Sequence, residues 1–182
     1  MIFDDIKQFL KKLFGTQKGA SMAKSKMPKL DEIDIIVTKL PAPTTQWPQG
    51  YSFEMKRGSK YLGKKLEFQN HGHPGFIIYF SLQEGDPHHP TGCQFLPDLP
   101  GVMWVQQSDL PDPPCPRYPC TWEQFSAIDV VKNEDDEPNR GLIVSNRNDF
   151  QKMFAFTLRF EIPGYPDVVE FDPIGSNQNG GD

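Results

Sequence analysis

The feature that most constrains the fold is the apolar run from Phe76 to Leu82, which Ser81 alone interrupts. A run of this length, rich in β-branched and aromatic residues and without a polar face, predicts a central strand covered on both sides. Just before it, Leu66 and Phe68 alternate with charged and polar residues, which predicts a second strand. The intervening segment 70–75 holds the Asn, Gly and Pro of a reversal, so the two strands are expected to form a hairpin.

Alternating segments along the rest of the chain predict further short strands separated by turns. This organisation is typical of a β-sandwich. We therefore predict an all-β fold, an antiparallel immunoglobulin-like β-sandwich over residues 30–174, followed by a polar tail at 175–182. Its core is expected to contain Phe76, Ile78, Phe80, Phe154, Phe156 and Leu158. The further strands are expected at Ile33–Val37, Tyr51–Met55, Cys93–Leu96, Val102–Gln106, Gln124–Val131, Leu142–Asn146, Met153–Phe160 and Val168–Phe171.

Residues 1–15 predict an amphipathic helix appended to this domain. At about 100° per residue the apolar side chains fall on one side and the charged ones on the other. Asp4 and Asp5 at its start, and Lys11 and Lys12 near its end, suit the helix dipole. Residues 16–29 have the composition of a flexible basic linker. The apolar stripe consists of Ile2, Phe3, Ile6, Phe9, Leu10, Leu13 and Phe14.

A helix this short is marginal alone in water, so its apolar stripe is expected to dock on another surface. We predict that this surface belongs to a protein partner or to a second copy of the chain. Packing over the domain's own sheet and binding to an anionic membrane surface are the alternatives.

Charge is divided unevenly along the chain. Residues 1–29 carry a net charge of +5 and the remainder −10, within a total of −5. Because an acidic body binds nucleic acid poorly, no nucleic-acid partner is expected. No apolar segment approaches the roughly 20 residues of a membrane span, and the first residues do not form a signal peptide. The three cysteines are no disulfide framework, so we expect a cytoplasmic protein.

Catalytic motifs are missing from the sequence. It contains no GxSxG, no HExxH and no glycine-rich phosphate loop, so we predict no enzyme activity and no cofactor. Two proline-rich segments, 83–100 and 107–121, are long for a sandwich, and both ligand recognition and capping of sheet edges fit them. Within the second, Cys115 and Cys120 leave a disulfide and two free thiols open as alternatives.

The histidines provide the alternative reading, a metal-binding protein or metalloenzyme. Imidazole and thiolate are ligands of zinc and copper, and the candidate set is His71, His73, His88, His89 and Cys93. A strand over residues 76–82 would hold the two histidine pairs about 20 Å apart or more, which argues against one shared site. The stretch 66–70 is similar to the first copper-ligand region of cupredoxins. The sequence has no His or Cys after Cys120, which argues against a copper site of that type.

A resemblance to a known family appears near the C-terminus. The runs Leu142–Asn148 and Phe154–Phe160, followed by Phe171-Asp172-Pro173-Ile174 and a tail rich in Asn and Gly, resemble the end of the small bacterial DP-EP family. The resemblance implies a single immunoglobulin-like sandwich without a known reaction. We therefore interpret the chain as a non-catalytic binding or structural module that uses its N-terminal helix to dock.

Overall fold

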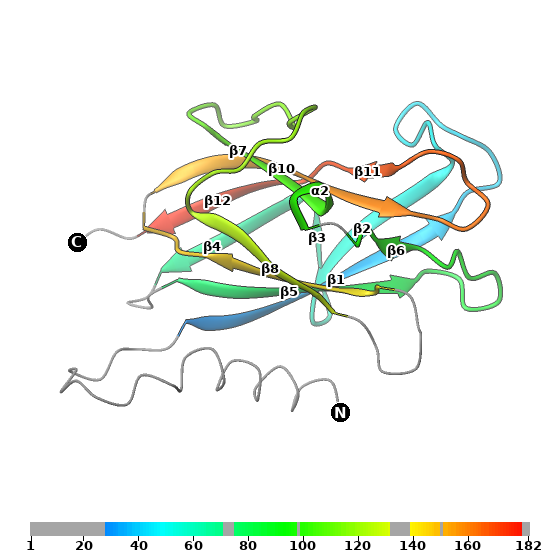
Figure 1. The fold of residues 1–182 in the computed structure, drawn as a ribbon, viewed down its shortest axis with the longest axis horizontal. Coiled ribbons are helices and arrows are strands. Elements are labelled where there is room, and N and C mark those ends of the chain that lie inside the picture. Colours follow the sequence, from blue (N-terminus) through cyan, green and yellow to red (C-terminus); the bar gives the residue numbers. More distant parts are fainter. Residues whose placement is uncertain (1–27, 71–74, 98, 132–138, 150, 180–182) are drawn as a thin grey trace.

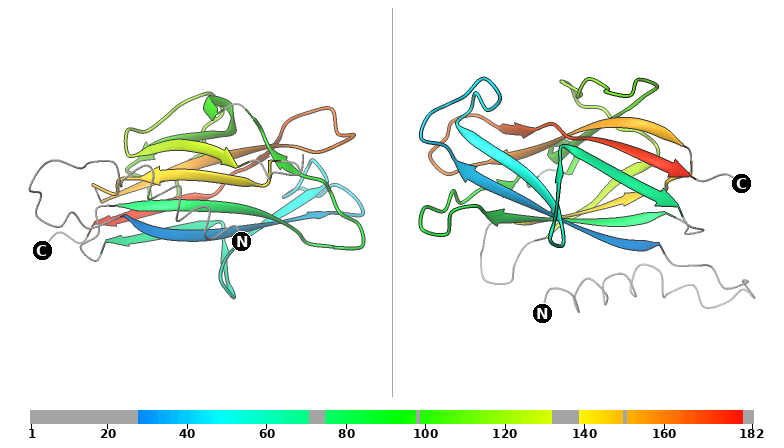
Figure 2. Two further views of the ribbon diagram at one scale, coloured as in Figure 1. Left: turned by 60° about the horizontal axis from the view of Figure 1, so that its bottom comes forward. Right: turned by 180° about the vertical axis from the view of Figure 1, so that it is seen from behind.

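The computed structural model describes residues 28–70, 75–97, 99–131, 139–149 and 151–179. In these residues the chain is almost entirely β-structure, with two six-stranded sheets and one four-residue helix, α2 (Leu99–Val102). Figures 1 and 2 show the strands in two layers that pack face to face. The all-β prediction is confirmed. The predicted helix at 1–15 and most of the linker lie outside the described residues.

The first layer, sheet A, is built around the apolar run. Strand β5 (Phe76–Glu84) lies between β1 (Lys29–Lys39) and β9 (Gly141–Asn146), and all of its first five residues are buried. Sheet A has the order β3-β2-β1-β5-β9-β8, in which the outer strands are β2 (Tyr51–Arg57), β3 (Lys60–Gly63) and β8 (Phe125–Val131).

The second layer, sheet B, is organised by the long strand β10 (Lys152–Glu161). One side of β10 pairs with β7 (Met103–Ser108) and β6 (Gln94–Phe95), and the other with β12 (Ile174–Asn179) and β11 (Val169–Phe171). Strand β4 (Lys65–Asn70) completes the layer beside β12.

The inward faces of the two layers meet in one aromatic core. Phe80 of β5 and Phe156 of β10 face each other across it with ring centroids 6.1 Å apart. All six residues predicted for the core lie in this cluster. The core prediction is therefore confirmed, because the period of two on β5 and β10 identifies the inward side chains.

The sheets are mixed, so the prediction of a purely antiparallel sandwich is wrong. Strands β1 and β5 run parallel, with Lys29 opposite Phe76, and β12 and β4 run parallel, with Ile174 opposite Lys65. Both pairs are separated in the sequence by other strands, which gives the chain the length it needs to return before pairing in parallel.

The predicted hairpin between residues 64 and 82 is also wrong. Strand β4 belongs to sheet B and β5 to sheet A, and Phe68 meets Phe76 across the core with ring centroids 5.2 Å apart. Sequence proximity suggested pairing, but two strands that both point apolar residues inward can also face each other from opposite layers. Strand β5 pairs instead with β1 and β9 along its two edges, which places it in the interior of sheet A and agrees with its continuous burial.

The end of the chain differs from the predicted polar tail, because residues 174–179 form strand β12. Its buried Asn177 exchanges hydrogen bonds with Asn146 of β9: each amide nitrogen donates to the other's oxygen, at 2.8 Å and 3.1 Å. Since these amides satisfy each other, a polar strand of sheet B can bury Asn177 against β9 of sheet A without leaving the two groups unpaired.

Candidate binding groove

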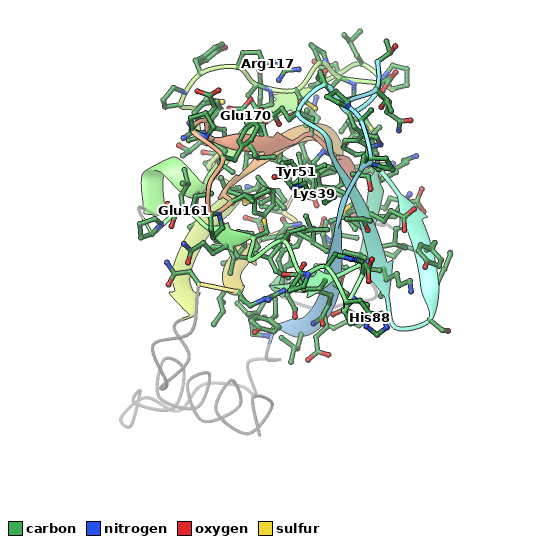
Figure 3. All side chains as sticks on the ribbon, turned by 90° about the vertical axis from the view of Figure 1, so that its right-hand side faces the viewer. Lys39, Tyr51, His88, Arg117, Glu161 and Glu170 are labelled. Carbon is green, nitrogen blue, oxygen red and sulfur yellow. The ribbon has the colours of Figure 1, made fainter. Side chains whose placement is uncertain are left out.

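A groove of about 390 Å³ opens where three segments approach one another: the loop 40–50 between β1 and β2, strand β11, and the loop 109–121 after β7. Figure 3 looks onto this part of the molecule and shows Arg117 above Glu170, with Tyr51 below them. The side chains that give the groove its chemistry are Trp47, Gln49, Lys64, Arg117, Glu170 and Asp172.

The loop 40–50 is held in shape by its own backbone and by sheet B. The amides of Thr44 and Trp47 each donate to the other's carbonyl, at 3.1 Å and 3.2 Å, and the Thr44 hydroxyl accepts from the Trp47 amide. The Gln49 side chain donates to the Val168 carbonyl at 3.2 Å and accepts from the Glu170 amide at 3.3 Å. This wall of the groove is therefore tied to Glu170 of β11 and to Val168, the residue just before that strand.

Trp47 forms the apolar part of that wall. Its half-buried ring packs on Phe53 and Phe171, with centroid distances of 5.9 Å and 6.2 Å. The Lys64 ammonium lies 4.8 Å from the centroid of the Trp47 ring, a cation–π arrangement. The ring is fixed from behind while part of it faces solvent.

The proline-rich loop 109–121 contributes Arg117 to the lining of the groove. The Thr157 hydroxyl of β10 lies 3.0 Å from the Pro116 carbonyl and 2.8 Å from the Asp172 carboxylate, so these two acceptors share its single hydrogen. The Arg117 guanidinium reaches back to Asp172 at 3.0 Å and to Glu170 at 3.5 Å. Proline lowers the conformational freedom that ligand binding would remove.

The charges in the groove are largely paired within the protein. Glu170 also meets Arg159 at 3.3 Å, so the two acidic side chains face two guanidinium groups. A mixed surface of this kind suits hydrogen-bonding groups next to an apolar ring better than a ligand of high net charge.

A second hollow, of about 540 Å³, shares Trp47 and Lys64 with the groove. It is also lined by Tyr61, which is 58% exposed. The Lys56 ammonium lies 4.1 Å from the centroid of the Tyr61 ring. Two partly exposed aromatic rings, Trp47 and Tyr61, thus line two adjoining hollows.

The candidate metal ligands are separated by the fold where the structure describes them. His88 and His89 lie on the loop after β5; the His89 ring contacts Asp86 at 2.8 Å, and its side chain is 81% exposed. Cys93 instead points into the core, where burial raises the pKa of its thiol well above the usual range. His71 and His73 lie outside the described residues. Among the described residues, no three His, Cys, Asp or Glu side chains gather as a metal site.

Cys115 and Cys120 are free thiols, so of the two alternatives, a disulfide and two free thiols, the structure has the second. Burial, and then the nearby negative charge of Asp172, raise the pKa of Cys115 to about 11. Its sulfur lies 3.8 Å from the Pro173 carbonyl.

Sequence reasoning reached only part of this site. It selected the loop 107–121 for its length and prolines, but it passed over the loop 40–50, although Trp47 stands there between Pro43 and Pro48. A tryptophan within a polar, proline-rich loop was the available signal. The docking residues Ile2, Phe3, Ile6, Phe9, Leu10, Leu13 and Phe14 lie outside the described residues.

The fold and the groove thus define an all-β sandwich with a polar groove beside the Trp47 ring. No protein-family model matches this chain, and no curated protein is similar to it. The predicted resemblance to the DP-EP family is therefore wrong; the short motifs that suggested it are ordinary strand and turn sequences of β9, β10, β11 and β12.

One structure found by comparison is the crystal structure of the inclusion body protein PixA from Burkholderia cenocepacia J2315. It shares 10% identity, the match covers 85% of this chain and 97% of that chain, and the TM-score is 0.28. A TM-score this low carries no argument about fold or function. In the part of the chain that the structure describes, no helix is long and apolar enough to cross a membrane.

Proposed function

We propose that this chain is a non-catalytic binding or structural module of the cytoplasm, an immunoglobulin-like sandwich that attaches to a protein partner or to a second copy through its N-terminal segment. The observation that supports a binding role is the groove, whose two loop walls are both fixed to sheet B before any ligand arrives. Preorganised polar groups beside partly exposed aromatic rings are the usual composition of a recognition surface.

The attachment element of this proposal is the segment 2–14. Its seven large apolar side chains each contribute about 1.5–3 kcal/mol when fully buried, which is sufficient reason for the segment to leave water. Its three lysines and the basic linker have the opposite charge to the acidic body.

The test compares two variants of the full chain. Phe9→Ser with Leu13→Ser removes two members of the apolar stripe, whereas Gln8→Ser changes only the polar side. Sedimentation and affinity capture from native extract are then compared with the wild-type chain. We expect the double variant to lose its association and Gln8→Ser to keep it; association that survives in both would refute the docking role.

The alternative of a metal site in the loop histidines stays a prediction. Metal analysis of untagged protein, with His71→Ala and His73→Ala together as the control, tests it. Stoichiometric zinc or copper that disappears in the variant would favour this alternative.

A further inference from the structure

Three residues on the outer side of sheet A form a patch that is buried although it does not belong to the core. Ile77 and Tyr79 of β5 and Ile143 of β9 are 2%, 9% and 3% exposed, but none of them is part of the interior cluster. Their neighbours Ile78 and Val144 do belong to the cluster, so the alternation of a strand directs the three side chains outward. Tyr79 is directly opposite Ile143 in the sheet. We call these three residues the sheet A patch.

On the outer side of sheet B, a described loop covers a residue that is buried in the same way. Thr157 is fully buried there because the loop 109–121 lies over it and accepts its hydrogen bond through Pro116. The same loop bonds to the edge of β7, where the Val105 amide donates to the Cys120 carbonyl at 3.0 Å. Trp104, the register partner of Thr157, makes a cation–π contact with the Arg159 guanidinium, which lies 4.1 Å from the centroid of its ring.

Sheet A has no such cover among the described elements. In Figures 1 and 2 sheet B lies on one side of sheet A, and no described helix or strand lies over the other side. An isoleucine on an uncovered sheet face keeps considerable exposure, because its neighbours in the sheet shield only its flanks. Near-complete burial of Ile77 and Ile143 therefore requires another segment over the patch.

The sequence indicates which segment this is. Outside the described residues, 71–74, 132–138 and 180–182 are short and polar or Gly-rich, and 98 and 150 are single residues. Residues 1–27 contain the apolar stripe of 2–14 and have the length to cover several strands.

Chain connection and charge agree with this assignment. Strand β1 begins at Lys29, and Leu30 is the register partner of Ile77, so the chain enters the sheet beside the patch. The linker up to residue 28 spans at most about 46 Å at 3.3 Å per residue, more than the roughly 36 Å of an 11-residue strand. Glu32 lies opposite Tyr79, and the charges of Glu32 and Asp34 add to burial in raising the pKa of Tyr79.

We propose that in the free chain the segment 2–14 packs its apolar stripe on the sheet A patch, with its lysines toward Glu32 and Asp34. This inference rests on the proposed function, because the same segment is the docking element there. Without a partner the segment 2–14 then lies on the sheet A patch, and a partner that binds the segment must displace it from sheet A.

A double-mutant cycle in the full chain tests the contact. Ile77→Ser and Phe9→Ser should each lower Tm, and the double variant should lose clearly less than the sum of the two, because each change removes the same contact. Ile36→Ser is the matched control, because Ile36 lies on the same outer side of β1, four positions beyond Glu32. The decrease in Tm that it causes should add to the decrease caused by Phe9→Ser. Strict additivity of Ile77→Ser with Phe9→Ser would overturn the proposal.

Zero-length crosslinking with a carbodiimide gives the second readout. The reagent joins a lysine amine to a carboxylate, so we expect peptides linking Lys7, Lys11 or Lys12 to Glu32 or Asp34, from protein of monomer mass. The same peptides confined to dimer mass would show exchange between copies and overturn docking within one chain.

The two proposals fail in different ways. Suppose that Ile77 and Phe9 are coupled and the crosslinks occur in the monomer, but that no association depends on the segment 2–14. The packing on the sheet A patch would then stand and the proposed function would be refuted. Association that depends on Phe9, without coupling between Phe9 and Ile77, would support the proposed function and refute the packing.

Discussion

Strand β12 makes a sharp prediction at Gly175, which lies against the ring of Phe154. A Cβ added at Gly175 would be 2.3 Å from Cζ of that ring, 2.7 Å from Cε2 and 2.9 Å from Cε1. Contacts this short do not occur, so the ring or the strand must move. The backbone of Gly175 is outside the left-handed region, so alanine meets no conformational strain and the cost is overpacking alone.

The magnitude follows from this crowding. Overpacking a core costs about 1–3 kcal/mol. In a domain of about 150 residues each kcal/mol lowers Tm by roughly 2–4 °C, so Gly175→Ala should lower Tm by about 2–12 °C. Phe154→Leu removes the ring atoms that the new methyl group would meet. In that background Gly175→Ala should cost close to nothing, which gives a coupling free energy of about 1–3 kcal/mol.

Urea unfolding followed by tryptophan fluorescence measures the cycle, with calorimetry as a second measure. Gly141→Ala is the matched control, since its Cβ would meet the Tyr79 side chain, with 2.7 Å to Oη, on the outer side of sheet A. Its cost should add to that of Phe154→Leu. If Gly175→Ala leaves Tm unchanged, or costs the same in both backgrounds, then β12 does not lie beneath Phe154 and the reasoning is refuted.

Three further predictions concern the core, the thiols and pH. Phe156→Ala should cost about 3–5 kcal/mol and melt far lower or fail to fold, and wild-type melting would contradict the core assignment. At pH 8 a disulfide reagent should modify Cys120 first, then Cys115, whose pKa of about 11 leaves roughly one thiolate per thousand, and Cys93 only on unfolding. Burial raises the pKa of Asp31, so its contribution to stability is greatest below the unfolded value of 3.8 and falls as pH rises through the folded value. The difference in Tm between wild type and Asp31→Asn should therefore change with pH above about 4, and a constant difference would contradict this.

The sequence could predict the strands and their inward faces but not their neighbours. Alternation identifies which side chains of β10 point inward, and Phe154, Phe156 and Leu158 are all buried as expected. Nothing in a period of two says that β4 pairs with β12 instead of β5. Strand β12 was hidden because its buried Asn177 is polar and its partner amide stands 31 positions away.

The groove was hidden for a related reason. Trp47, Lys64, Arg117 and Asp172 come from four separate segments, and only the strand order brings them together. A local pattern can select a loop for its length and proline content, as it did for 107–121. It cannot show that the loop's guanidinium meets carboxylates that follow β10, because that contact depends on the register of β11 beside β10.

The apolar run itself contained information that the two-layer prediction did not use. A strand with no polar side, as Phe76–Phe80 is, requires cover on both faces, whereas each sheet of a two-layer sandwich has one face toward water. Ile77 and Tyr79 are buried as well as Phe76, Ile78 and Phe80, as a strand without a polar side requires. The same sequence has an apolar stripe in residues 2–14, whose side chains favour burial against another surface. The proposed packing of the segment 2–14 on the sheet A patch would cover the outer face of β5 and remove the apolar stripe from water at the same time.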